Sequence, residues 1–124
     1  MTVLQLVYGA NILVAGSIGI RSLFFPESAA HTVFQGAYPV SEVMRLVGCL
    51  WLAIAVLSGL GLWQPTPFAA VLVLQLIYKG SWLLVVALPA VAARQPIPRG
   101  MTLFFVIWVL VLPFVIPWAR LFKA

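Results

Sequence analysis

Lys79 is the residue of this sequence that is best placed to do chemistry, because its amine lies inside the apolar run VLQLIYKGSWLLVVALP at 73–89. Gln75, Tyr78 and Trp82 lie within four residues of it. Side chains three or four positions apart share one face of a helix, so a helix here predicts a stripe of these four groups. An amine among such groups can bind an anionic or carbonyl-bearing molecule, and a lone lysine can also form a Schiff base.

A second polar stripe lies near the start of the chain. The run VLQLVYGAN at 3–11 carries the same Gln and Tyr as VLQLIYKGS at 73–81 and adds Asn11. The rest of the chain does not repeat at this spacing, so the two runs share local chemistry rather than a duplication. Both would lie on helices that run in the same direction, and we expect the two stripes to face one interior.

Three tryptophans, Trp51, Trp82 and Trp108, fall near the middle of three different apolar stretches. An indole N–H away from water needs a hydrogen-bond partner, and an indole face attracts a cation. Ordinary packing against the core or lipid is the simpler explanation for any one of them. Together with the two stripes they predict one ligand-binding set: Gln5, Tyr8, Asn11, Trp51, Gln75, Tyr78, Lys79, Trp82 and Trp108.

The composition shows which solvent surrounds these residues. Hydrophobic residues make up 65% of the 124, and charged residues only 7%. Charged side chains usually form about a quarter of a soluble protein, because its outer surface has to meet water. The sequence therefore predicts that most of this surface meets lipid.

Four apolar stretches are long enough to cross a bilayer, which takes about 20 residues per helix. The first lacks the basic residues that begin a secretory signal, so we expect it to be retained. Short connections place consecutive helices antiparallel. We predict an all-α integral membrane protein, an up-down-up-down four-transmembrane-helix bundle that forms a single domain over 1–124, with spans at roughly 2–25, 41–63, 67–90 and 100–121.

Small residues indicate where the helices approach each other. Ala15 and Gly19 are four apart in the first span, and Ala55 and Gly59 repeat that spacing in the second. Such strips allow close packing of helices in a membrane. They can join helices within one bundle or two copies of it, so a homo-oligomer is one possible partner.

The depth of Lys79 makes it a site candidate. A charged side chain at mid-membrane costs about 2.5–3.5 kcal/mol on insertion scales, and such residues usually face the bundle interior. A structural explanation is that the side chain stretches to a headgroup or stays neutral. The functional explanation is that it binds a ligand, and both stay open at this point.

A second group of polar residues gathers at the end of the bundle that holds the first and third connections. Pro26 and the acid after it predict a short helix along the interface. One interpretation is a salt-bridge network that fixes helix ends, and the other is a site for an anion or a headgroup. The group comprises Arg21, Glu27, His31, Glu42 and Arg45.

Several functions are excluded by residue counts. One Cys and one His cannot build a zinc or iron–sulfur site, and no cofactor is identifiable. The Lys and Arg residues gather at predicted helix ends rather than along a soluble face, which speaks against nucleic acid as a partner. Their distribution predicts that both termini lie outside and that the end with Arg45 is cytoplasmic. No acid falls within the middle of a span, which disfavours a carboxylate-driven antiporter.

The layout of the chain and the run MRLVGCLWLAIAVLSGLGL, with Arg45 and Gly48 in an Arg-x-x-Gly pattern, resemble those of the small DoxX-like membrane proteins. This resemblance covers the order of the spans and the long first connection with Pro26. It implies a four-helix bundle in the bacterial plasma (inner) membrane. Some members take part in quinone-linked redox assemblies, which implies a related role.

Two functions from different classes follow from the residues and the resemblance. One is an accessory or binding protein that holds a lipid-like or quinone-like molecule in a polar and aromatic pocket, with membrane lipids or a membrane complex as partners. The alternative is a small oligomeric transporter or channel whose path is lined by the same polar residues. An enzyme ranks third, since Lys79 has no evident orienting partner.

Overall fold

The computed structural model describes residues 2–122 of the chain. Helices make up 79% of it, and the described part contains no strand. The helical elements in chain order are α1 (Val3–Phe24), α2 (Pro26–Thr32), α3 (Glu42–Trp63), α4 (Ala70–Trp82), the π-helix η1 (Leu83–Ala87), α5 (Leu88–Ala92), α6 (Arg99–Val115) and α7 (Trp118–Leu121).

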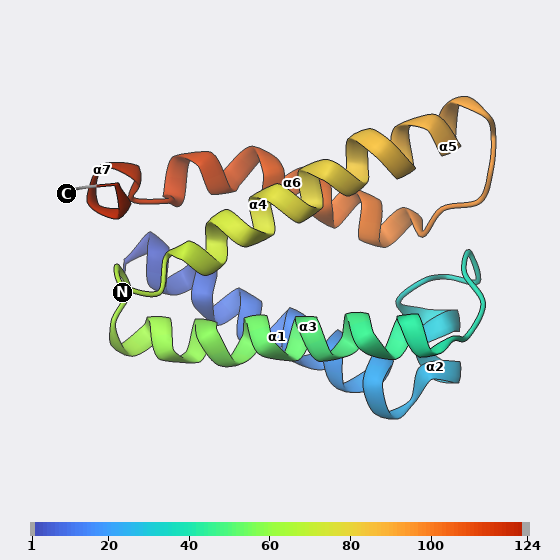
Figure 1. The fold of residues 1–124 in the computed structure, drawn as a ribbon, viewed down its shortest axis with the longest axis horizontal. Helices are drawn as coiled ribbons and strands as arrows, with labels where there is room; N and C mark the ends of the chain where they lie inside the picture. Colours follow the sequence, from blue (N-terminus) through green and yellow to red (C-terminus); the bar gives the residue numbers. More distant parts are fainter. Residues whose placement is uncertain (1, 123–124) are drawn as a thin grey trace.

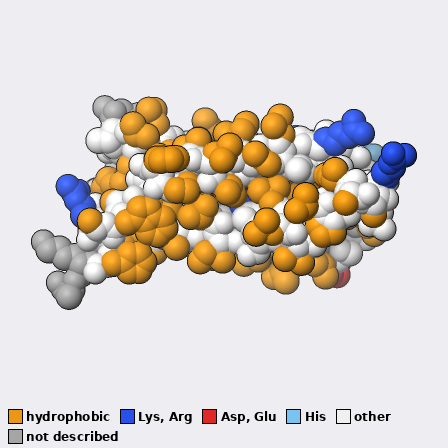
Figure 2. Space-filling model, turned by 90° about the horizontal axis from the view of Figure 1, so that it is seen from above, with side chains coloured by type: hydrophobic (Ala, Val, Ile, Leu, Met, Phe, Trp, Pro, Cys, Tyr) orange, Lys and Arg blue, Asp and Glu red, His pale blue; other side chains and the backbone are white. Residues whose placement is uncertain are grey.

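Three helices are long and apolar enough to cross a membrane. They are α1, α3 and the continuous helix Ala70–Ala92 that α4, η1 and α5 form together. Helices of this length and composition indicate a membrane protein. A fourth apolar helix, α6, is shorter. Hydrophobic side chains cover the length of the face in Figure 2, and Lys and Arg gather at its two ends.

The predicted fourth span, 100–121, is wrong at its end. Helix α6 stops at Val115, and α7 starts only at Trp118. The residue before a proline is pushed out of the helical region. Ile116, which precedes Pro117, accordingly has an extended backbone with ψ 126°. The chain therefore breaks here instead of continuing one helix.

The start of α1 and the start of α2 follow from local sequence. Thr2 caps α1 by accepting a hydrogen bond from the Gln5 backbone, and the Gln5 side chain accepts one from the Thr2 backbone in return. This reciprocal pair satisfies two amide groups that the first helical turn leaves free. Pro26 occupies the first position of α2, where its missing N–H costs nothing, and Glu27 lies in the first turn. The predicted short helix at Pro26 is confirmed.

The long helices lie along the length of the molecule, and consecutive ones run in opposite directions (Figure 1). They form two layers. Helices α1 and α3 lie side by side in one layer, with α2 at their end, while α4 to α5 and α6 form the other. The α1–α3 contact is closest at two glycines. A Cβ atom at Gly48 would lie 2.9 Å from the carbonyl oxygen of Gly19, and one at Gly19 would lie 2.9 Å from the backbone nitrogen of Leu52.

Only part of the predicted small-residue packing is present. Gly19 packs as expected, but its partner on α3 is Gly48. Ala55 lies near Gly16, whereas no atom approaches within 4 Å of the place where a Cβ of Gly59 would be. The close contact thus lies nearer the α2 end of the helices than the spacing of Ala55 and Gly59 indicated.

Candidate ligand-binding site

Asn11 of α1 and Gln75 of α4 form the most buried pair of hydrogen-bonded side chains within residues 2–122. Each side chain is only 1% exposed. Asn11 Nδ2 donates to Gln75 Oε1 at 2.8 Å, and Gln75 Nε2 donates to Asn11 Oδ1 at 3.2 Å. Buried amides need such partners because an unpaired polar group in an apolar medium is costly. The two stripes predicted from the sequence therefore meet, and they satisfy each other.

Lys79 lies one helical turn beyond Gln75 and is 3% exposed. Its Nζ atom lies 5.3–5.6 Å from the centroids of four aromatic rings. Within residues 2–122 it makes neither a hydrogen bond nor an ion pair. Aromatic faces attract a cation at this distance. The rings belong to Tyr78, Phe104, Phe105 and Trp108.

Gln5 and Tyr8 lie in the first two turns of α1, away from Lys79. Gln5 takes part in the cap described above. The Tyr8 hydroxyl donates to the carbonyl oxygen of Pro65 at 2.6 Å, and its ring fills the space above Gly61. These two predicted binding residues therefore tie α1 to the end of α3 and the following turn.

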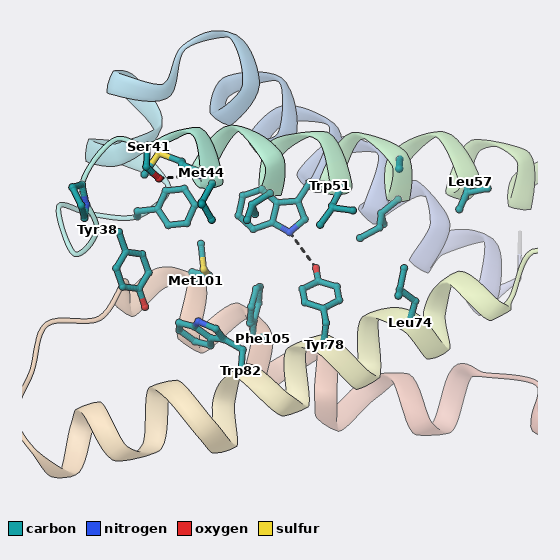
Figure 3. Close-up of a pocket in the computed structure, with 17 residues that line it drawn as sticks. Tyr38, Ser41, Met44, Trp51, Leu57, Leu74, Tyr78, Trp82, Met101 and Phe105 are labelled. Carbon is teal, nitrogen blue, oxygen red and sulfur yellow. Dashed lines mark hydrogen bonds between the residues drawn. The ribbon is translucent and has the colours of Figure 1, made fainter.

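A cavity of about 480 Å³ lies between α3 on one side and α4 and α6 on the other (Figure 3). Ligand pockets in proteins usually measure about 300–1,000 Å³, so a small lipophilic molecule fits. Its lining comes from α3, α4, α6 and the segment before α3. The residues are Phe34, Tyr38, Pro39, Ser41, Val43, Met44, Val47, Leu50, Trp51, Ala53, Ile54, Leu57, Leu74, Tyr78, Trp82, Met101 and Phe105.

One hydrogen bond crosses this cavity. Trp51 Nε1 of α3 donates to the Tyr78 hydroxyl of α4 at 3.2 Å. In Figure 3, Tyr38 and Trp82 lie on one side of the bond, and Leu57 and Leu74 lie on the other. The cavity thus has a polar and aromatic part near the segment before α3 and an apolar part toward the start of α4.

Aromatic packing defines the walls of the polar part. The rings of Phe34 and Trp51 stack with an interplanar angle of 22° and centroids 5.8 Å apart. Tyr78 and Trp82 both meet Phe105 edge to face. These contacts hold flat ring surfaces in fixed positions, which suits a planar ligand group.

The cavity opens sideways, because the residues along its rim are exposed. Val43, Leu50 and Leu57 follow each other at seven-residue intervals on α3, with exposed fractions of 67%, 57% and 36%. Leu74 lies on the opposite rim and is also exposed. The mouth therefore lies on an apolar flank of the molecule, between α3 and α4.

The structure divides the predicted binding set. Trp51, Tyr78 and Trp82 line the cavity. The Asn11–Gln75 pair and Lys79 are buried but do not line it, and neither does the half-buried Trp108. The Lys79 amine lies near the rings of Tyr78 and Phe105, which do line it. Gln5 and Tyr8 are at the far end of α1. The predicted residues therefore do not form a single polar pocket: three line the cavity, and the others lie outside it.

Sequence reasoning missed several lining residues. Met44, Val47 and Ile54 follow a helical spacing around the predicted Trp51 on α3, and this pattern was a usable signal. Phe105 is an ordinary apolar residue in an apolar helix, so its type alone carried no signal. The same holds for Phe34 and Tyr38 in the connection before α3 and for Met101 at the start of α6.

The predicted interfacial group does not form one site. Arg45 pairs with Glu42 at 3.4 Å and also donates from Nε to the carbonyl oxygen of Leu23 at 3.1 Å. Arg21 donates to Ser28 Oγ at 3.1 Å. Glu27 and His31 are exposed, and neither side chain forms a hydrogen bond or ion pair with another described residue. The two arginines are thus used separately, each to fix a helix end.

The polar side chains of the cavity lining are hydroxyls and indoles. The lining contains no acid, histidine, lysine, arginine or cysteine, and its polar groups belong to Tyr38, Ser41, Trp51, Tyr78 and Trp82. Comparisons with known protein families, with curated protein sequences and with solved structures found no match. What the cavity holds therefore has to be inferred from its own geometry.

Proposed function

We propose that this chain is a membrane protein that holds a lipid-like or quinone-like molecule in the cavity between α3 and α4. The observation that carries the proposal is the lateral mouth of the cavity. A lipophilic molecule can enter there from the hydrocarbon without passing through water. The walls behind the mouth supply flat aromatic surfaces and the hydroxyls of Tyr38 and Tyr78. Apolar pockets with a few polar groups are the usual form of small-molecule sites.

The proposal includes the arrangement in the bilayer. Helix α6 is the fourth crossing of an up-down-up-down four-helix bundle, the termini lie outside, and the chain resides in a bacterial plasma (inner) membrane. This arrangement and the accessory role agree with the resemblance to DoxX-like proteins. Membrane lipids are the expected partners, and a second copy or a membrane complex is a further one.

A transporter or channel is disfavoured by the state of the polar residues. Asn11 and Gln75 use their amides on each other, and aromatic rings surround Lys79. A path for a polar solute needs such groups along its whole length and free to bind. A binding pocket for a lipophile needs neither, so it remains the better proposal.

The test uses two leucines of α3 that differ in position but not in exposure. Leu50 lines the mouth and is 57% exposed, whereas Leu46 lies one turn away, does not line the cavity and is 58% exposed. Leu50→Trp puts an indole into the mouth, and Leu46→Trp is its matched control. Each protein is extracted gently with its lipids and analysed by native mass spectrometry for a co-purifying small molecule.

We expect the natural protein and Leu46→Trp to retain a bound molecule and Leu50→Trp to lose it. Retention by Leu50→Trp at the level of the control would place the molecule outside the cavity. The absence of any bound molecule from all three proteins, also after incubation with lipophilic probes, would contradict the proposed function.

A further inference from the structure

We infer that the cavity selects an uncharged lipophile whose head carries a carbonyl oxygen, with that oxygen held between Tyr38 and Trp82. This inference rests on the proposed function and names the chemical class of the molecule. A quinone ring and the ester groups of a diacylglycerol both carry this chemistry. The test below distinguishes these two sources.

The Tyr38 hydroxyl gives the first support for this inference. It is buried, and no described residue meets it with the geometry of a hydrogen bond, although the Trp82 side chain lies close enough to lower its pKa. A buried hydroxyl without a partner is costly, so a partner supplied by a ligand would stabilise it. In Figure 3 the Tyr38 and Trp82 side chains point toward one another inside the cavity. Trp82 contributes an indole N–H, which can only donate.

Each polar side chain in this part of the cavity can donate a hydrogen bond to a ligand. The Tyr78 hydroxyl already accepts a hydrogen bond from Trp51, so its own proton is available to a ligand. The other hydroxyl in the lining, Ser41 Oγ, already accepts from the backbone of Met44. The indole N–H of Trp82 can only donate and the two tyrosine hydroxyls can also donate, so a carbonyl oxygen, which accepts two hydrogen bonds, matches them.

The charge of the head is set by the same lining. No acid or base lines the cavity, so a charged headgroup would lose its water without gaining a counterion. Burial raises the pKa of Tyr38, and the neighbouring Trp82 side chain only partly opposes this effect. The phenol therefore remains protonated at neutral pH and keeps its donor. Phosphatidyl lipids do not meet these conditions.

The position of the head follows from the two parts of the cavity. Tyr38 and Trp82 lie on one side of the Trp51–Tyr78 hydrogen bond, and the apolar rim residues Leu57 and Leu74 lie on the other. A molecule with its oxygen at Tyr38 therefore directs its tail along Leu57 and Leu74 and out into the bilayer. Head and tail each meet the part of the cavity that matches them.

The experiment measures the affinity of the purified protein in lipid nanodiscs for four probes. An alkylated benzoquinone and a short-chain diacylglycerol carry the carbonyl group. An alkylbenzene of similar size lacks it, and phosphatidylglycerol adds a charge. The variants are Tyr38→Phe and Trp82→Phe, which keep ring packing and remove one donor each, with Trp63→Phe as a control at the exposed end of α3.

We expect the carbonyl probes to bind more tightly than the alkylbenzene, and Tyr38→Phe to weaken their binding by about threefold to tenfold, the effect of one hydrogen bond. Trp82→Phe should act similarly and Trp63→Phe should not act. The alkylbenzene should bind all variants equally. The tighter of the two carbonyl probes then identifies the source.

Two results would overturn the inference and leave the proposed function standing. One is equal binding of the alkylbenzene and the carbonyl probes, with no effect of Tyr38→Phe. The other is preferential binding of phosphatidylglycerol. If no probe binds, or if Leu50→Trp binds every probe as the natural protein does, the proposed function fails as well.

Discussion

The two main helix interfaces of this protein are built in opposite ways. Helices α1 and α3 meet backbone to backbone, since a Cβ on Gly48 would lie 2.7 Å from the backbone nitrogen of Leu23. The interface between the two layers instead depends on side chains: the Asn11–Gln75 amide pair and the Trp51–Tyr78 bond. The first interface is tightest at its glycines, where backbone meets backbone, and the second encloses the cavity.

This difference reflects how helices associate in lipid. Lipid tails are as apolar as leucine, so burial alone gives helices little reason to associate. Small residues stabilise a contact by allowing close packing, and interhelical hydrogen bonds stabilise it at a longer distance. An interface of the second kind can hold large aromatic residues and still leave room for a ligand. The molecule thus combines a rigid pair of helices with a layer spaced for binding.

The largest effect is expected from one methyl group added at the close α1–α3 interface. Gly48→Ala should lower the free energy of unfolding by about 2–3 kcal/mol, because backbone atoms have to move to admit the new Cβ. Unfolding in mixed micelles measures it. Gly59→Ala is the control, since nothing lies within 4 Å of its new Cβ. Equal stability of the two variants would refute the close α1–α3 contact.

The amide pair tests the spaced interface. Gln75→Leu leaves the Asn11 amide buried without a partner and should cost about 1–2 kcal/mol. The double variant Asn11→Leu/Gln75→Leu should cost less than the sum of the two single changes, with a coupling of about 1 kcal/mol. The same unfolding assay measures all three proteins. Strict additivity would mean that the pair does not hold the layers together.

Lys79 is expected to act in the opposite direction. Lys79→Met keeps the length of the side chain and removes the amine, and it should raise the free energy of unfolding by about 1 kcal/mol. A mid-membrane charge costs about 2.5–3.5 kcal/mol, and aromatic faces return only about 0.5–2 kcal/mol. A variant less stable than the natural protein would show that the amine has a stronger partner, such as a bound lipid.

The smallest effect is expected where the two layers meet outside the apolar core. Gln35 Oε1 accepts a hydrogen bond from the backbone nitrogen of Gly100 at 2.8 Å, and this contact is exposed. Gln35→Ala should cost about 0.5 kcal/mol, the lower end for a hydrogen bond that water can replace. A cost as large as that of Gln75→Leu would mean that the layers are held at their end rather than at their centre.

The sequence predicted most of the helices because apolar length is a strong signal in membrane proteins. The spans at 2–25 and 41–63 agree closely with α1 and α3. Pro26 was a usable start signal for α2. The break at Pro117 also had a signal in the sequence, because the residue before a proline is disfavoured in a helix. The continuous apolar composition around Pro117 concealed this signal.

The site was predicted less well, for a physical reason. Helical spacing shows which residues share a face, but it does not show how deep each one lies relative to another helix. Gln5 and Tyr8 share a face with Asn11, yet only Asn11 reaches Gln75. Tyr38 depends on the path of the connection between α2 and α3, where Gln35 has a positive φ of 51°. No periodic pattern predicts such a path.

The break after Val115 has a consequence for the surrounding bilayer. Helix α6 has 17 residues and spans about 25 Å, against about 30 Å for the hydrocarbon core. Helices α1 and α3 have 22 residues each and reach about 33 Å. In the proposed arrangement, in which α6 is the fourth crossing, a bilayer that matches both lengths has to be thinner beside α6 than beside α1 and α3. That arrangement imposes a gradient of membrane thickness around the protein, lowest at α6, which lines the cavity with Met101 and Phe105.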